Sequence, residues 1–434
     1  MPTTLNFNTV NEAMKIHYRS LRVKEMVYKN NPLLAMIPKY ESFGGLSMPI
    51  PIIYGNPQRT GAIFSDAQSI PSTSSLSQFS ITRVKDYSFA TVDAETIKAS
   101  RGDANAFLRY LTMEIDGAIH TIKRRLAFDI YGDGTSSLGS ISGATTVAID
   151  NVNRTMVTLT TASDVTKYEV GMVLSFFDAT GATARTTAGP PSPITETRAF
   201  QVIAVDRDGG TVTVDRQITS VAATDVVYAY GNFDPTAAGG AAVNAVGVKV
   251  DGLAAWIPSD RSTLATHPLA EDFNGVIRST DATRLGGIYF DGAAMPIEEA
   301  LISAAGRLAR EGGEPDVCLV DFATFVSLEK ALGSKVRYTE AKARDVDVGF
   351  QGLAVQGPTG VIKVIPDLNC QANTAWLLQM DTWALNSLGD CPQILDLDDN
   401  RMLREASADA YEVRIGYYAN MSCNAPGYNA RVSL

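Results

Sequence analysis

The chain contains 434 residues, and its 37 Lys and Arg against 47 Asp and Glu give a formal net charge of −10. This length allows two or three domains, and the acidic balance argues against a protein that holds nucleic acid through many phosphate contacts. Only 19% of the residues are charged whereas 45% are hydrophobic, so we expect part of the surface to be buried against other subunits.

Sequence signals of membrane insertion and export are missing. No stretch approaches the roughly 18 consecutive apolar residues of a membrane helix. The first residues also lack a basic segment followed by an apolar core. We therefore expect a soluble protein that is made and kept in a cytoplasm.

Residues suited to catalysis or metal binding are few and scattered. The sequence has no Walker loop, no G-x-G-x-x-G fingerprint, no H-E-x-x-H and no G-x-S-x-G. No pair of cysteines has C-x-x-C spacing, so we expect free, half-buried thiols. We expect no catalytic, cofactor-binding or metal-binding residue and no cofactor. The cysteines and histidines in question are Cys318, Cys370, Cys391, Cys423, His17, His120 and His267.

The N-terminal segment, residues 11–30, has the pattern of a short helix that Pro32 ends. Bases outnumber acids in it, so it could contact nucleic acid or an acidic partner, although a solvated helix face is the favoured interpretation. Residues 42–95 follow, with four prolines, a glycine pair and a serine-rich run, and cannot bury a core of their own. We interpret them as a long extended loop with a strand pair at 79–84 and 87–91.

The strongest helical pattern in the chain covers residues 103–130. Its apolar residues recur at steps of three and four, with Asp103 as a candidate N-cap and Gly132 as the stop. Such a helix would be about 40 Å long. The apolar series is Leu108, Leu111, Ile115, Ile119, Ile122, Leu126 and Ile130.

Residues 144–232 are rich in Thr, Val and Ala and predict a β-rich inserted domain, either a small β-barrel or a β-sandwich. The sequence DRDGG at 206–210 predicts a hairpin turn, because it lacks the ligand spacing of a calcium loop. The predicted strands are 145–149, 156–160, 170–176, 200–205, 211–214 and 225–230.

The remainder alternates helices and strands, which makes the fold class α+β. Pro296 is expected at the first position of a helix that ends at Gly312. Asp321 is expected to cap a further helix that Gly333 closes. The predicted strands in this part are 317–320, 361–365, 374–380 and 411–418.

At this point the chain resembles the major capsid proteins of tailed double-stranded DNA bacteriophages with the Hong Kong 97 type of fold. The resemblance is carried by the order of elements and by four phrases in them. These are DIYGDG at 129–134, PDVCLV at 315–320, KVRY at 335–338 and GPTGVIKVIPD at 357–367. The β-rich block departs from the simplest members of that family.

The resemblance implies a division of the chain into seven parts. They are an N-terminal arm (1–41), an extended loop (42–95), a peripheral domain with the spine helix (96–143), the inserted β-rich domain (144–232), a peripheral return segment (233–290), an axial domain (291–395) and C-terminal strands (396–434). The extended loop would lie over an adjacent subunit. The arm would cross beneath another.

The resemblance also implies partners and a location. The chain would self-assemble into the hexamers and pentamers of an icosahedral shell, with a separate scaffolding protein, a portal and a decoration or cement protein as partners. The shell would enclose double-stranded DNA without sequence-specific binding, in the virion, after assembly in the host cytoplasm. Members of the family can cross-link a loop lysine to an asparagine. Lys85 lies near the loop, but no motif matches the other residues, so we expect non-covalent stabilisation.

Two other interpretations stay open from sequence. An encapsulin-like cargo compartment would use the same fold, although its subunits are typically shorter and lack such an insertion. A hydrolase with a β-rich accessory domain is the less favoured alternative. Its metal cluster would have to come from Asp396, Asp398 and Asp399, for which a polar turn is the better interpretation.

Overall fold

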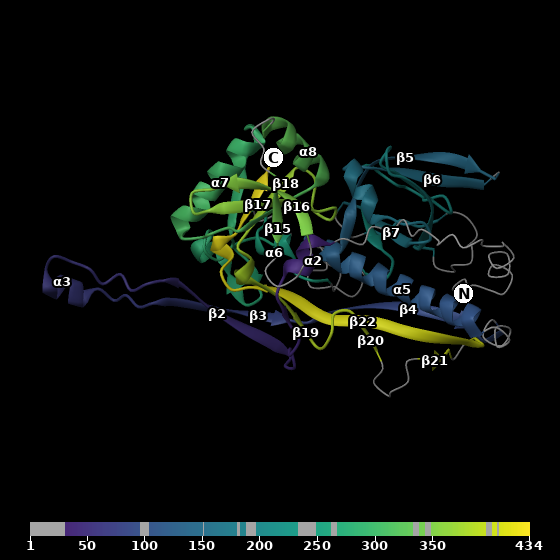
Figure 1. The fold of residues 1–434 in the computed structure, drawn as a ribbon, viewed down its shortest axis with the longest axis horizontal. Helices are drawn as coiled ribbons and strands as arrows, with labels where there is room; N and C mark the ends of the chain where they lie inside the picture. Colours follow the sequence, from purple (N-terminus) through teal and green to yellow (C-terminus); the bar gives the residue numbers. More distant parts are fainter. Residues whose placement is uncertain are drawn as a thin grey trace.

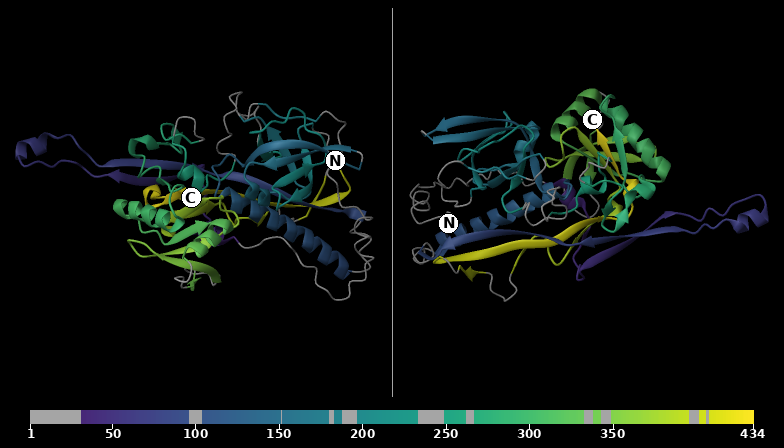
Figure 2. Two further views of the ribbon diagram at one scale, coloured as in Figure 1. Left: turned by 90° about the horizontal axis from the view of Figure 1, so that it is seen from above. Right: turned by 180° about the vertical axis from the view of Figure 1, so that it is seen from behind.

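The computed structural model describes residues 31–95, 104–150, 152–179, 183–187, 197–232, 249–261, 267–332, 338–342, 349–395, 402–405 and 408–434. The predicted helix at 11–30, the caps Asp103 and Gly333 and the aspartates at 396–399 lie outside these ranges. Figure 1 shows a helix-flanked sheet on one side, a barrel beside a long helix on the other, and a thin ribbon projecting away from both. The projection is equally clear in the two other views (Figure 2).

The long helix predicted from its period is present as α5, and its C-terminal half buries Ile122 and Leu126. Helix α7 begins at Ile297, one residue later than expected, because Pro296 has an extended ψ of 144° and is the N-cap. Gly312 ends α7 with a φ of +91°, as predicted. The helices are α2 (Pro32–Met36), α3 (Phe64–Ser69), α5 (Ala104–Asp129), α6 (Leu253–Trp256), α7 (Ile297–Glu311) and α8 (Phe322–Leu332).

A six-stranded sheet is built around the long strand β22 and lies along α5 (Figure 1). Strand β4 pairs with β22 over its whole length, from Val84 opposite Ala419 to Asp93 opposite Ala410. The strands are β1 (Lys39–Tyr40), β4 (Val84–Asp93), β19 (Trp383–Ser387), β20 (Gln393–Ile394), β21 (Leu403–Arg404) and β22 (Ala410–Cys423).

The predicted strand pair at 79–84 and 87–91 is wrong as a pair, although both strands exist. Strand β3 (Ser75–Thr82) pairs with β2 (Ser47–Gly55) in an antiparallel ribbon, whereas β4 pairs with β22. Only one residue separates β3 from β4, which is too short for a hairpin turn. The chain therefore continues from the ribbon into the sheet instead of folding back.

The β-rich block forms a closed barrel with the strand order β10-β5-β6-β9-β8-β7, so the barrel alternative is the one observed. The DRDGG sequence is the turn between β8 and β9, as predicted. The interior is apolar, with Phe176 and Phe200 packed edge to face at 5.5 Å. The strands are β5 (Ser137–Ile149), β6 (Val152–Leu159), β7 (Val173–Phe177), β8 (Phe200–Asp206), β9 (Thr211–Val214) and β10 (Val226–Ala229).

A mixed seven-stranded sheet forms the remaining unit, in the order β13-β23-β18-β14-β17-β16-β15. Its central strand β14 sends Cys318 and Val320 into the core beneath α7 and α8, and Leu319 into the core shared with α5 and α6. Asp321 caps α8 as predicted, accepting bonds from the backbone N–H of Ala323 and Thr324. The strands are β13 (Ile288–Asp291), β14 (Val317–Val320), β15 (Tyr338–Lys342), β16 (Gly349–Gln356), β17 (Val361–Pro366), β18 (Thr374–Leu378) and β23 (Ala430–Ser433). The small hairpin β11 (Asp272–Phe273) and β12 (Val276–Ile277) lies outside both large sheets.

Candidate assembly surfaces

The projecting ribbon of β2, α3 and β3 is fixed to the body through contacts along its two strands. Phe79 is fully buried there and packs edge to face on Trp256, with 4.9 Å between ring centroids. The backbone N–H of Ser80 donates to the carbonyl of Asn274 at 2.6 Å, and Arg284 donates to the carbonyl of Tyr54 at 2.6 Å. These contacts hold the strands of the ribbon against α6 and the segment that follows it.

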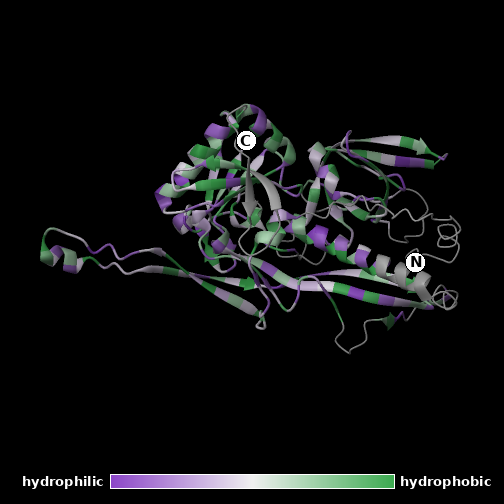
Figure 3. Ribbon diagram, in the orientation of Figure 1, coloured by the Kyte–Doolittle hydropathy of each residue, from purple (hydrophilic) through white to green (hydrophobic). Residues whose placement is uncertain are grey.

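The outer part of the ribbon exposes large hydrophobic side chains. Phe64 in α3 is 82% exposed and its neighbour Ile63 is 61% exposed. Ile53 and Leu76 on the two strands are 66% and 62% exposed. Figure 3 shows the hydrophobic colouring around α3, at the end of the ribbon farthest from the body. Apolar groups gathered at the tip of a projecting element are typical of a surface that another protein covers.

Two buried charged side chains and one half-buried aspartate meet where α5 contacts the sheet. The Lys249 ammonium pairs with the Asp86 carboxylate on β4. Asp129, the last residue of α5, is close enough to both that their charges shift its pKa. Burial raises the pKa of Asp129 to about 6; Lys249 opposes that rise and Asp86 adds to it. This group connects the long helix, the sheet and the segment that precedes α6.

Asp367 forms a second buried junction, at the end of β17. Its carboxylate accepts a hydrogen bond from the Tyr131 hydroxyl at 2.8 Å and from the backbone N–H of Asn369 at 2.9 Å. The backbone N–H of Leu33 in α2 also donates to it, at 3.4 Å. Burial raises the pKa of Asp367, and these hydrogen bonds oppose that rise. One carboxylate thus connects α2, Tyr131 just after α5, and the seven-stranded sheet.

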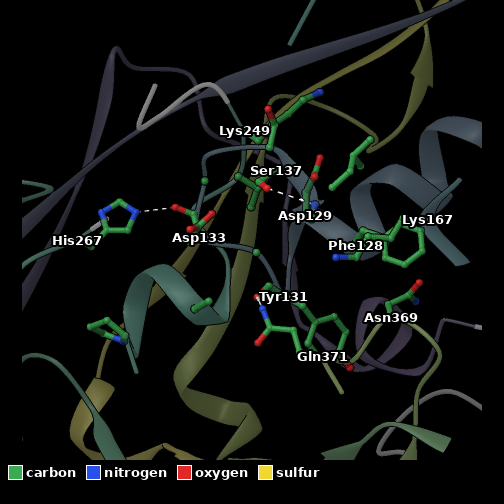
Figure 4. A pocket seen from close by; sticks show the side chains of 18 of the residues that line it. Phe128, Asp129, Tyr131, Asp133, Ser137, Lys167, Lys249, His267, Asn369 and Gln371 are labelled. Carbon is green, nitrogen blue, oxygen red and sulfur yellow. Dashed lines mark hydrogen bonds between the residues drawn. The ribbon is translucent and has the colours of Figure 1, made fainter. Parts of the chain in front are cut away.

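A cavity of about 440 Å³ lies between the end of α5, the start of β5 and α6 (Figure 4). Lys167, Lys249 and Asp129 line it together with Asp133 and His267. The ring Nε2 of His267 is 2.5 Å from the carbonyl oxygen of Asp133. The lining mixes both signs of charge, and its residues come from the end of α5, the start of β5 and the segment around α6.

The residues singled out in the sequence do not converge on one site. His120 lies on α5 and His267 lies in the cavity, whereas His17 and the aspartates at 396–399 fall outside the described residues. Within the described ranges, no three His, Cys, Asp or Glu side chains lie close enough together to hold a metal ion. Lys85 is exposed on β4. Sequence patterns did not indicate Asp86, Asp129, Lys249 or Asp367, because their partners are distant in the chain.

The cysteines are free, as expected, but three of the four are more deeply buried than expected. Cys318, Cys370 and Cys423 are buried and only Cys391 is half-buried. Burial raises the pKa of the Cys318, Cys391 and Cys423 thiols to about 12. Thiols with such pKa values are poor nucleophiles, and a role in packing explains them. Among the described helices, none is both long and apolar enough to cross a membrane.

No protein-family model and no curated protein matches the sequence. By structure, the chain is similar to a chain of the capsid asymmetric unit of cyanophage A-1(L), with a TM-score of 0.53, 11% identity, and coverage of 95% of this chain and 94% of that one. It is also similar to a chain of the capsid of a native GTA particle, with a TM-score of 0.46, 8% identity and 99% coverage of both. A chain of Mycobacterium phage Ogopogo is similar with a TM-score of 0.42, 8% identity and 98% coverage of both chains. At this identity the first likeness establishes architecture over nearly the whole chain: this protein has the fold of a phage capsid protein.

Proposed function

We propose that the chain is the major capsid protein of a tailed double-stranded DNA phage and that its function is assembly and not catalysis. The observation that carries the proposal is the fold shared with the cyanophage A-1(L) capsid chain over 95% of the sequence. The projecting ribbon adds physical support. Its outer half buries little of its own apolar surface, and neighbouring subunits of a shell would cover it.

The proposed organisation is that of the Hong Kong 97 type. Residues 1–41 form the arm, 42–95 the extended loop, 96–143 the peripheral domain with the spine helix, and 144–232 an inserted barrel. Residues 233–290 return to the peripheral domain, 291–395 form the axial domain, and 396–434 supply the C-terminal strands. The closed barrel between α5 and α6 and the projecting ribbon of β2, α3 and β3 support this division.

In this proposal the copies form hexamers and pentamers of an icosahedral shell in the virion, after assembly in the host cytoplasm. Contacts that repeat between unlike surfaces of identical subunits close into rings and shells. A separate scaffolding protein and a portal would complete assembly, and the DNA would be enclosed without sequence-specific binding. The net charge of −10 is consistent with that weak interaction with DNA.

The test is electron microscopy and light scattering of the purified full-length protein, expressed with and without the candidate scaffolding protein. Closed shells, or rings of five and six subunits, are the expected result. A monodisperse monomer under every condition would refute the assembly function. Efficient shells from this chain alone would retain that function and remove the need for a separate scaffolding protein.

A further inference from the structure

The hairpin of β5 and β6 extends beyond the barrel, as Figure 1 shows at the upper right. The register of β5 shifts between Ile141 and Gly143, which marks a β-bulge where the hairpin departs from the barrel wall. Beyond that bulge the two strands stay paired up to Ile149 opposite Val152. Bulges re-aim a strand at the rim of a barrel, and this one directs the hairpin outward.

Within the described part of the chain, the other edge of β5 has no backbone partner over residues 143–149, which we call the free edge. Strand β10 pairs with β5 only from Ser137 to Ser140. The last backbone bonds on that side join Ile141 to Asp225 and Thr224. Among the described residues, no strand pairs with the free edge opposite β6. Every second residue there directs its backbone N–H and C=O away from β6, as in any edge strand.

The composition of the free edge favours pairing with another strand. Its sequence, GATTVAI, is rich in β-branched residues and contains no charge and no proline. Soluble proteins usually protect an exposed edge with lysine, proline or an additional bulge. None of these devices is present in residues 143–149. Thr145, Thr146 and Ala148 are exposed.

We propose that the free edge of β5 pairs antiparallel with the free edge of a second copy of this chain, across a two-fold axis between neighbouring subunits. This inference rests on the proposed function, since the shell is what brings two copies together. An isologous contact brings identical residues face to face, and an edge without charge can meet itself without repulsion. The same neutrality gives a partner of opposite charge nothing to recognise.

The small size of the contact also favours a second copy as the partner. Seven residues of paired edge bury far less than the roughly 1,200 Å² of a stable independent interface. The pairing would therefore be weak between dissolved subunits and would form where other contacts already hold two copies in register. This is the situation of a bracing contact between neighbours in a shell.

The inference is tested with single cysteines at each of positions 144–148 of the full-length chain. Opposite residues of an antiparallel pair lie within disulfide reach. Ser163→Cys is the control, because Ser163 is exposed on the barrel outside the hairpin. Shells are mildly oxidised and run on a non-reducing gel. At least one hairpin variant should give a dimer band at least tenfold stronger than that of the control.

Two other outcomes would overturn the proposed pairing. Shells without a dimer band from any hairpin variant, or with an equal band from Ser163→Cys, would overturn the pairing and leave the shell function intact. Wild-type protein that builds no shells would refute the proposed function and this inference with it. A second variant, Thr146→Lys, places two ammonium groups at the pairing and should lower the denaturant midpoint of shell dissociation, whereas Ser163→Lys should not.

Discussion

The ammonium of Lys249 lies 2.5 Å from a carboxylate oxygen of Asp86, and both side chains are buried, with 4% and 8% of their surfaces exposed. Asp86 belongs to β4, which precedes the barrel in the sequence. Lys249 lies between β10, the last strand of the barrel, and α6. Charges removed from water are tolerated only when they are paired. The ion pair therefore fastens the segment after the barrel to the sheet that β4 forms with β22.

Replacing Lys249 by Met should destabilise the subunit by about 3–5 kcal/mol, because it leaves Asp86 buried without its counter-ion. The free energy of unfolding, measured by chemical denaturation of the unassembled subunit, checks this. Lys85→Met is the matched control, since Lys85 is exposed on β4, the strand that carries Asp86. Equal stability of the two variants would contradict a structural role for the pair.

The raised pKa of Asp129 predicts a pH dependence of stability. Its folded pKa of about 6 exceeds the ordinary aspartate value of 3.8, so between these pH values the folded state binds more protons than the unfolded state. The contribution of this group to stability therefore falls as pH rises from about 4 to 6, by an amount on the order of 3 kcal/mol.

Asp129→Asn should flatten this part of the stability profile relative to wild type. Denaturation midpoints measured at intervals between pH 4 and 7 give the comparison. Asp208→Asn in the exposed turn between β8 and β9 is the control, and its profile should follow that of wild type. A profile of Asp129→Asn parallel to wild type would remove Asp129 as the source of the slope.

Local patterns predicted the elements whose stability depends on neighbours in the chain. Helix α5 was predictable because Ile115, Ile119, Ile122 and Leu126 place one apolar stripe on the sheet. The six barrel strands were predictable for the same reason, since β-branched runs alternate with turn signals. Capping by Asp321 and the stop at Gly312 depend on the adjacent residues alone.

Contacts between distant segments could not be predicted in this way. The partner of β4 is β22, more than 300 residues later, so the short spacing between β3 and β4 favoured the wrong pairing. From the sequence alone, Asp86 would be assigned to the solvent-facing side of a strand. In the structure it is buried beside Lys249. Asp367 reads as a turn residue, although Tyr131 and Leu33 both donate to its carboxylate.

Arg278 should be irreplaceable by lysine. Its guanidinium is fully buried, donates to the carbonyl oxygens of Ala255, Trp256 and His267 at 2.8, 3.1 and 3.0 Å, and stacks over the ring of Phe273. A lysine ammonium lacks this planar fork, and a buried carbonyl without its donor costs about 1–3 kcal/mol.

Arg278→Lys should therefore lower the free energy of unfolding by at least about 2 kcal/mol. Urea denaturation of the unassembled subunit provides the measurement. Arg310→Lys, at a side chain that is 71% exposed, should change it by less than about 0.5 kcal/mol. A loss of similar size in both variants would show that the three carbonyls do not depend on the guanidinium.

The tip of the ribbon should affect assembly without affecting the subunit fold. Phe64 is 82% exposed, so Phe64→Asp removes almost no intramolecular contact. If a neighbouring subunit buries this ring, each lost contact costs about 1.5–3 kcal/mol, which weakens association about tenfold or more. Gln68→Asp adds the same charge to the same helix at an exposed polar position and is the control. Circular dichroism should be unchanged for both variants, while sedimentation and electron microscopy should show fewer shells for Phe64→Asp alone. Shells of normal yield and stability from Phe64→Asp would mean that the exposed ring is not an assembly contact, and loss of shells in both variants would assign the effect to charge instead of to the apolar surface.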